Sequence, residues 1–197
     1  MRKRYTIFAG INGAGKSTLY RECYQPWKNE KRINTDEMVA RVGSWQDESL
    51  QLKCGREAVK LIKAYFEEGI SFNQETTLTG RTIVNNVKVA KAKGYTDHLY
   101  YVGLDSTDIA LQRIEKRVRE GGHGIATKDV LRRYGNSFEN LGAIFKYCDK
   151  VSLYDNSHTM RAVAKFSKGN LVFRLKKLPS WMTENPALQT LSDYYFG

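Results

Sequence analysis

Residues 8–20 read FAGINGAGKSTLY, and this segment places one lysine and two hydroxyl groups directly behind a group of glycines. The spacing Gly10-x4-Gly15-Lys16-Ser17 fits the phosphate-binding pattern G-x4-G-K-[ST]. Glycines let the backbone curl so that several N–H groups converge on one anion, and the N-terminus of a following helix adds partial positive charge. We predict that Lys16 contacts the β- and γ-phosphates of a nucleotide and that Ser17 ligates Mg²⁺. The residues expected to hold the phosphates are Gly10, Asn12, Gly13, Ala14, Gly15, Lys16, Ser17 and Thr18.

The residues on either side of this loop are the elements that must hold it in place. Residues 5–9 (YTIFA) are aromatic, small or β-branched and favour a strand, whereas residues 16–23 (KSTLYREC) contain no glycine or proline and suit a helix. A strand before the loop and a helix after it are the context that the pattern requires. A glycine-rich turn without a ligand is the alternative, and it is disfavoured because both flanks fit.

Acidic residues follow two further predicted strands, at the end where parallel sheets bind their ligands. Asp36 follows the second strand, and a carboxylate there could take the proton of an attacking hydroxyl. Capping of the next helix by Thr35 or Asp36 explains the same position equally well. Glu75 and its hydroxyl-bearing neighbours could bind an acceptor hydroxyl or a Mg²⁺-bound water, the alternative being a cap at Thr79 with Glu75 as an incidental charge. The expected acceptor-binding residues are Asp36, Glu75, Thr76 and Arg81.

A glycine-rich turn later in the chain separates two helical patterns that are rich in arginine. The helices are expected near residues 106–120 and 127–147, and residues 121–124 (GGHG) lie between them. A hinged pair of helices can close over a nucleotide and exclude water. The sequence therefore predicts a helical lid over about residues 113–133.

Arginines on this lid are candidates for stabilising the charge of a transferring phosphate. The first choices for catalysis are Arg117 and Arg133, and the secondary candidates are Arg113, His123 and Arg132. At helical spacing Arg113 and Arg117 share a face, while Arg119 points elsewhere. An ordinary basic helix surface is the alternative for some of these residues.

Strands and helices alternate along most of the chain, which predicts an α/β fold of the P-loop nucleoside-triphosphate-binding type with a parallel sheet and helices on both faces. Strands are expected near 5–9, 31–35, 70–75, 98–104 and 150–154, and helices near 16–24, 36–42, 47–68, 80–93, 106–120 and 127–147. A β-hairpin turning at Lys168-Gly169-Asn170 and a helix near 186–195 are expected to follow. We expect one domain over residues 1–197, with the C-terminal hairpin and helix occupying about 158–197.

Composition limits the class of partner. The 197 residues carry a formal net charge of +11, which suits an anionic partner such as a nucleotide, a phosphorylated metabolite, a nucleic acid or an acidic protein. No apolar run is long enough to span a membrane, and the first apolar run leads into the loop instead of a cleavage site. Cys23, Cys54 and Cys148 show no metal-ligand spacing. We therefore expect a cytoplasmic protein with free thiols and no membrane partner.

Five of these segments together resemble the zeta-toxin family of P-loop kinases, most closely its short, single-domain bacterial members. They are FAGINGAGKST, INTDEMVA, FNQETTLTGR, GYTDHLYYVGLDS and RVREGGHGIATKDVLRRYGNSFENL, within about residues 4–156. The resemblance implies the fold of small nucleotide and metabolite kinases, ATP as the phosphate donor, and the amino sugar of UDP-N-acetylglucosamine as the acceptor. It implies that Lys16 binds phosphate, Asp36 is the base, Glu75 helps to bind the acceptor and two lid arginines hold the transferring phosphate. It also implies a cognate antitoxin protein.

Three functions remain open from the sequence. An ATP-dependent kinase of a small hydroxylated metabolite, above all a nucleotide sugar, is favoured. A kinase of nucleic-acid ends is disfavoured because the arginines gather in one lid and not along an aromatic-lined groove. A nucleotide-binding switch without a second substrate would need no acid at Asp36 or Glu75.

Overall fold

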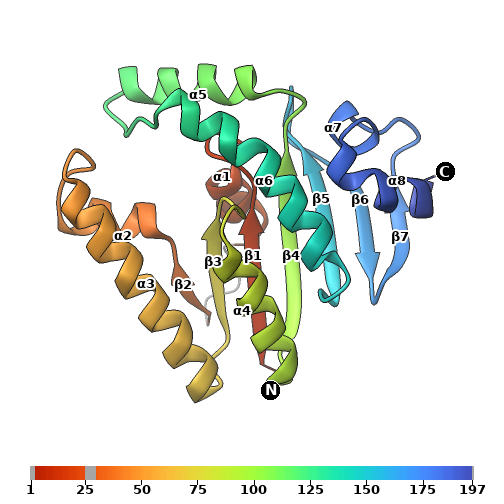
Figure 1. Cartoon of the computed structure of the whole chain (residues 1–197), viewed down its shortest axis with the longest axis horizontal. Helices are drawn as coiled ribbons and strands as arrows, with labels where there is room; N and C mark the ends of the chain where they lie inside the picture. The colour runs from red at the N-terminus through yellow and green to blue at the C-terminus, as the bar shows by residue number, and fades with distance from the viewer. Residues whose placement is uncertain (1–2, 25–29, 197) are drawn as a thin grey trace.

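The computed structural model describes residues 3–24 and 30–196, and in this part of the chain seven strands form one sheet in the order β2-β3-β1-β4-β5-β6-β7 (Figure 1). The strands are β1 (Arg4–Ala9), β2 (Lys31–Ile33), β3 (Phe72–Thr76), β4 (Thr96–Gly103), β5 (Lys150–Asp155), β6 (Arg161–Ser167) and β7 (Asn170–Arg174). Strands β1 to β5 pair in parallel, whereas β6 and β7 are antiparallel additions at one edge. The predicted parallel sheet and C-terminal hairpin are confirmed.

Helices cover both faces of this sheet, as the alternation of strands and helices predicts (Figure 1). They are α1 (Lys16–Cys23), α2 (Thr35–Val42), α3 (Glu48–Glu68), α4 (Arg81–Ala92), α5 (Thr107–Arg119), α6 (Thr127–Phe145), α7 (Ser180–Thr183), the 3-10 turn η1 (Pro186–Leu188) and α8 (Gln189–Phe196). Successive side chains of β1 explain the two layers: Tyr5 and Ile7 join the core cluster that includes residues of α3, α4 and α6, whereas Phe8 joins the cluster that includes residues of α1 and α5. A strand buried on both faces must be largely apolar, and from Tyr5 to Ala9 the only polar side chain of β1 is that of Thr6, whose hydroxyl shares a hydrogen bond with Tyr24.

The C-terminal region shows where local patterns were sufficient and where they were not. Lys168 (φ 50°) and Gly169 (φ 77°) form the two-residue turn of the hairpin β6–β7, as predicted. Helix α7 was not predicted, and a tertiary contact fixes its position: a Cβ at Gly103 would lie 2.3 Å from Cε2 of Trp181, so only glycine lets the indole pack on β4. The predicted helix near 186–195 is divided into η1 and α8.

The described residues contain no membrane-spanning helix and two buried cysteines. None of the described helices combines the length and the apolarity that crossing a bilayer requires. Cys54 and Cys148 are buried free thiols, whereas the side chain of Cys23 lies outside the description.

Asp97 on β4 is a buried acid that the active site does not use. Its side chain is fully buried, and neither carboxylate oxygen has a hydrogen-bond partner among the described residues. Burial and the neighbouring Asp149 raise the pKa of Asp97 to about 8, and Lys91 opposes them.

We expect the change Asp97→Asn to stabilise the protein in a pH-dependent way. An unfolded aspartate titrates near pH 3.9, and the folded state binds this proton more tightly, so stability falls as the pH rises from about 4 to about 8. The neutral amide removes this loss. The melting temperature of the variant should exceed that of the wild type at pH 8, and the difference should shrink toward pH 4. A difference that does not depend on pH would contradict the assignment.

Candidate active site

The glycine-rich loop between β1 and α1 forms a cradle of backbone N–H groups. Gly10, Gly13 and Gly15 have φ values of 138°, 78° and 102°, which L side chains rarely adopt. A Cβ at Gly10 would lie 2.4 Å from the Val102 carbonyl oxygen, so this glycine is required for close packing as well. Helix α1 begins without a side-chain cap and without an acid in its first turn. Its first N–H groups therefore remain available to an anion.

Lys16 lies inside this cradle with only 8% of its surface exposed. Its Nζ donates to the carbonyl oxygen of Ile11 at 3.0 Å. Burial is the main cause of a lowered pKa at Lys16; the charges of Glu75 and Asp36 oppose it, and those of Arg117 and Arg133 add to it. A buried ammonium that faces further cations is stabilised by an added anion, as expected of a phosphate-binding lysine.

Asp36 is not the cap of helix α2, and neither is Thr35. The cap is Asn34, whose Oδ1 accepts from the backbone N–H groups of Asp36 at 2.9 Å and Glu37 at 3.4 Å. The carboxylate of Asp36 is therefore left to face the cavity, with 39% of its side chain exposed, and the capping alternative does not hold. Its Oδ2 lies 3.3 Å from Nε2 of His123. Burial alone would raise the pKa of Asp36, but His123, Lys16 and Arg117 lower it below its ordinary value.

Glu75 is a shared acceptor at the tip of β3 and not an incidental charge. Its side chain is 7% exposed, and Ser17 Oγ donates to Oε1 at 2.7 Å. Its Oε2 accepts from Asn34 Nδ2 at 3.0 Å and pairs with Arg32 Nη2 at 2.7 Å. Thr79 does not cap α4, because the cap position is Gly80, without a side-chain bond. Glu75 thus joins the predicted metal ligand Ser17 to the segment that carries Asp36.

Arg32 on β2 was missed by the sequence reading, although it organises this network. Its guanidinium bonds Glu37 as well as Glu75, and it lies 3.6 Å from the centre of the Tyr20 ring. An arginine within a strand, followed shortly by acids, was the available signal. Asn156 was also missed: its Nδ2 donates to the Ala14 carbonyl oxygen at 2.9 Å.

The lid arginines divide by what they contact. Arg113 braces the loop, since Nη2 donates to the Asn156 carbonyl oxygen at 2.7 Å and Nη1 to that of Gly13 at 3.4 Å. Arg133 on α6 donates to Asn12 Oδ1 at 2.7 Å. Arg132 is exposed and pairs with Asp129 at 3.0 Å. Arg119 points to solvent, as its helical spacing predicts, and its side chain is 71% exposed.

Arg117 differs from the other lid arginines because two of its guanidinium nitrogens are buried without a hydrogen bond among the described residues. Its Nε and Nη2 are buried and make no hydrogen bond to any described residue. Burial is the main cause of a lowered pKa at Arg117, and Asp36 opposes it. Gly122 permits this arrangement, because a Cβ there would lie 2.5 Å from Cγ of Arg117. The side chain is thus fixed where its charge acts on both Lys16 and Asp36.

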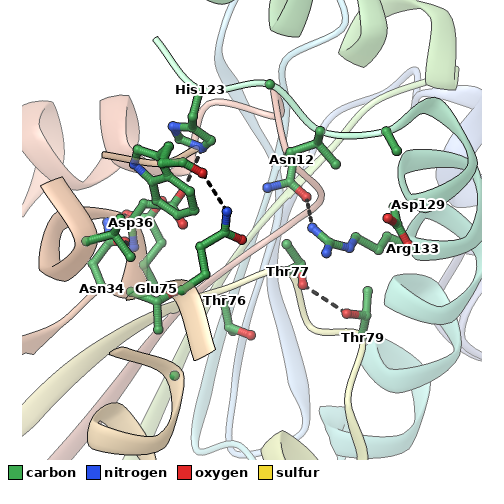
Figure 2. Close-up of a pocket in the computed structure, with 18 of the residues that line it drawn as sticks. Asn12, Asn34, Asp36, Glu75, Thr76, Thr77, Thr79, His123, Asp129 and Arg133 are labelled. Atoms are coloured by element: carbon green, nitrogen blue, oxygen red, sulfur yellow. Dashed lines mark hydrogen bonds and ion pairs between the residues drawn. The ribbon is translucent and has the colours of Figure 1, made fainter. Parts of the chain in front are cut away.

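These elements surround a cavity of about 800 Å³ that opens beside the cradle (Figure 2). One wall comes from the lid, and the opposite wall comes from α2, α3 and the tip of β3. Of the predicted residues, the cavity brings together Asn12, Lys16, Asp36, Glu75, Thr76, His123, Arg132 and Arg133. Arg81 is exposed at the start of α4 and does not line it.

The donor set suits a nucleoside triphosphate and a metal that arrives with it. Among the described residues there is no group of three or more His, Cys, Asp or Glu side chains able to hold a metal ion alone. Ser17 and Glu75 offer two oxygens beside the cradle, while the remaining ligands of a Mg²⁺ ion ordinarily come from phosphates and water. The unpaired guanidinium of Arg117 and the buried ammonium of Lys16 supply the cations that phosphates need.

A glycine cradle with a buried lysine, the acid Asp36 at the start of α2 and arginines on the helix pair α5–α6 define a P-loop phosphotransferase. Comparison with known proteins agrees. The sequence model for zeta toxins matches residues 1–162, and the chain belongs to the zeta toxin family. A relative from Haemophilus influenzae, described as an uncharacterized protein, is 33% identical over 134 residues, which are 68% of this chain and 94% of the relative.

Solved structures share the fold at low sequence identity. A chain of the AvrRxo1-ORF1:-ORF2 complex aligns with a TM-score of 0.72 and 12% identity over 98% of this chain and 66% of its own length. The same complex with ATP gives a TM-score of 0.70 and 13% identity over 86% of this chain. A structure from the PezAT toxin–antitoxin system of Streptococcus pneumoniae gives 0.60 and 15% identity over all of this chain and 79% of its own length. This chain spans only 60% to 66% of the length of the AvrRxo1 chains.

Proposed function

We propose that this protein transfers the γ-phosphate of ATP to a hydroxyl of a small metabolite, most specifically a nucleotide sugar such as UDP-N-acetylglucosamine. The observation that carries the proposal is the guanidinium of Arg117: its Nε and Nη2 are buried without a hydrogen-bond partner among the described residues, and its charge acts on both Lys16 and Asp36. Buried N–H donors without an acceptor are costly, and a phosphate is a group that would supply the acceptors. Family membership supports ATP as the donor and the nucleotide sugar as the acceptor.

Each residue then has a defined task in the transfer. The cradle and Lys16 hold the β- and γ-phosphates, while Arg117 stabilises the charge of the transferring group. The acceptor hydroxyl forms a new bond to the γ-phosphorus, the bond to the β–γ bridging oxygen breaks, ADP leaves, and the hydroxyl proton passes to Asp36. Mg²⁺, when bound at Ser17, supplies further charge neutralisation. Glu75 holds the Ser17 hydroxyl toward this position.

The outer wall of the cavity is proposed to bind the rest of the acceptor. Trp45, Leu52 and Gly55 line it from α3 and the loop before α3. Gly55 lies inside the long helix α3, and a Cβ there would meet no atom within 4 Å, so packing does not require glycine. The missing side chain leaves room in the cavity instead.

The change Gly55→Leu should therefore raise stability and weaken acceptor binding together. Leucine is a better helix former than glycine by about 0.8 kcal/mol, so the melting temperature should rise. The new side chain should raise the KM of the acceptor at least tenfold by filling space. Gly135 in α6 is the matched control, because a Cβ there also meets nothing within 4 Å and the residue lies outside the cavity lining. Equal KM values in Gly55→Leu and Gly135→Leu would contradict binding of the acceptor at this wall.

The proposed function is tested by mass spectrometry of a metabolite extract incubated with the protein and MgATP, with Lys16→Ala as the inactive control. Gain of one phosphate by a nucleotide sugar in the wild-type sample alone supports the proposal. Phosphate on another metabolite would replace the acceptor and keep the enzyme class. ATP hydrolysis without any phosphorylated product would favour a nucleotide switch, and labelling of added oligonucleotide ends would favour a nucleic-acid kinase.

We also propose a protein antitoxin as the partner. Membership of the zeta toxin family supports it, and the pneumococcal structure with the same fold comes from a toxin–antitoxin system. Expression of the wild type should slow bacterial growth, whereas Lys16→Ala should not. Equal growth of the two strains would argue against toxicity.

A further inference from the structure

Three side chains from separate segments meet at the mouth of the cavity. His123, in the loop between α5 and α6, lies 3.3 Å from Asp36 Oδ2 through its Nε2 (Figure 2). Its ring also stacks on Trp45, in the segment between α2 and α3, where the ring centres are 4.0 Å apart and the planes differ by 18°. His123 is only 13% exposed. The imidazole is thus held between an aromatic face and the carboxylate.

We propose that Trp45 and His123 are positioning residues for Asp36: the stacked imidazole fixes one oxygen of the carboxylate, so that Asp36 is competent as a base only while the lid loop lies over α2. This inference rests on the proposed function, in which Asp36 accepts the proton of the acceptor. Trp45 contributes the flat surface that sets the plane of the imidazole, and His123 contributes the contact to the carboxylate.

The contact geometry explains how the proton acceptor is oriented. An imidazolium, or the neutral tautomer with its proton on Nε2, can donate toward Oδ2. In the structure this contact is an ion-pair distance without hydrogen-bond alignment, because Nε2 of His123 has no hydrogen-bond partner among the described residues. The contact engages Oδ2 and leaves Oδ1 to receive a proton from the acceptor. Fixing one carboxylate oxygen restricts rotation of the other, and a misplacement of about 1 Å at a reacting group can cost about 10²-fold in rate.

The charges around Asp36 come from three different elements. Lys16 on α1 and Arg117 on α5 act together with His123, and all three favour the carboxylate over the carboxylic acid. Burial opposes them. Phosphates would offset the charges of Lys16 and Arg117, whereas His123 lies on the lid loop and stays beside Asp36. The lid loop therefore links closure over the nucleotide with orientation of the base.

The geometry is tested first on the protein alone, by NMR of its three histidines. The ring protons of His123 should resonate upfield of those of His98 and His158 because of the stacked indole, and Trp45→Leu should abolish that upfield shift. Trp45→Phe should retain part of it. Unchanged His123 resonances in Trp45→Leu would overturn the stacking, whether or not the protein transfers phosphate.

The role is tested next by kinetics with UDP-N-acetylglucosamine and MgATP. His123→Gln should lower kcat about 10²-fold with little change in the KM of ATP, and the acid limb of kcat/KM should move to higher pH, since the group that lowers the pKa of Asp36 is lost. Trp45→Leu should lower kcat in the same direction, and His158→Gln, an exposed position, should leave the rate unchanged. A loss of rate with an unmoved acid limb would reduce His123 to a structural residue. Absence of transfer by the wild type would contradict this acceptor, and the NMR result would still decide whether Trp45 holds His123.

Discussion

Replacement of Arg117 by alanine is expected to lower kcat by about 10³- to 10⁵-fold, the usual contribution of an arginine that stabilises the transition state of phosphoryl transfer. The KM of the acceptor should change little, because Arg117 does not line the cavity that we assign to the acceptor. The reason lies in its surroundings: Nε and Nη2 are buried without a partner among the described residues, so the side chain gains its hydrogen bonds when phosphate arrives. Steady-state kinetics with varied acceptor separates kcat from KM.

Arg119→Ala is the matched control for this prediction. Arg119 lies on the same helix, is 71% exposed and contacts only Glu115 at 4.0 Å among the ion pairs of the described residues, so its loss should change the rate by less than twofold. Arg133→Ala should lie between the two, because Arg133 acts through Asn12 of the loop. A loss of less than about threefold in Arg117→Ala would return Arg117 to the class of ordinary surface arginines.

The change Asp36→Asn is expected to remove transfer by about 10²- to 10⁴-fold and to leave the affinity for ATP nearly intact. The amide has the same shape and cannot accept the proton. The fold should tolerate it, because the helix cap is made by Asn34 and needs only the backbone N–H of Asp36. Calorimetric titration with a non-hydrolysable ATP analogue measures the affinity, and product formation measures the transfer.

Glu48→Gln provides the comparison for Asp36→Asn, because Glu48 is an exposed acid that lines the same cavity and makes no ion pair among the described residues. It should retain most of its activity. Collapse of ATP binding in Asp36→Asn, in parallel with activity, would show that Asp36 serves the metal or the structure. An unchanged rate would leave the proton without an acceptor at this position.

The predictions for Arg117 and Asp36 concern residues that can be changed one at a time. The hydrogen-bonded group of Arg32, Asn34 and Glu75 is different, because its members depend on one another. Glu75 binds Ser17 on one oxygen and Arg32 with Asn34 on the other, so its removal would disturb the metal side and the helix cap together. The activity of a Glu75 variant would therefore combine several effects and would not measure a single step of the transfer. The side chains of Arg117 and Asp36 are not hydrogen-bonded into this network, so each of these two changes removes one group that is proposed to meet the substrates.

The sequence by itself determined the phosphate cradle and the succession of strands and helices along the chain. The glycine-rich pattern depends only on the local backbone conformation of the loop. With a strand before the loop and a helix after it, Lys16 can lie only beside the phosphate cradle. Alternating apolar segments likewise predict β1 to β5 and the helices between them, because the periodicity that marks a strand or a helix lies within a short window of the chain. The turn at Lys168 and Gly169 is local for the same reason.

Only the tertiary structure decided which polar side chains meet. Sequence spacing left Asp36 equally balanced between a base and a helix cap, and the answer came from Asn34, which occupies the cap and connects to Glu75 on a neighbouring strand. The pairing of Trp45 with His123 had no signal in the chain, since 77 residues lie between them and their contact depends on how the lid loop lies against the segment between α2 and α3. The lid arginines are the same type of residue but have different contacts. The contact of each side chain is fixed by packing across the fold and not by its spacing along a helix.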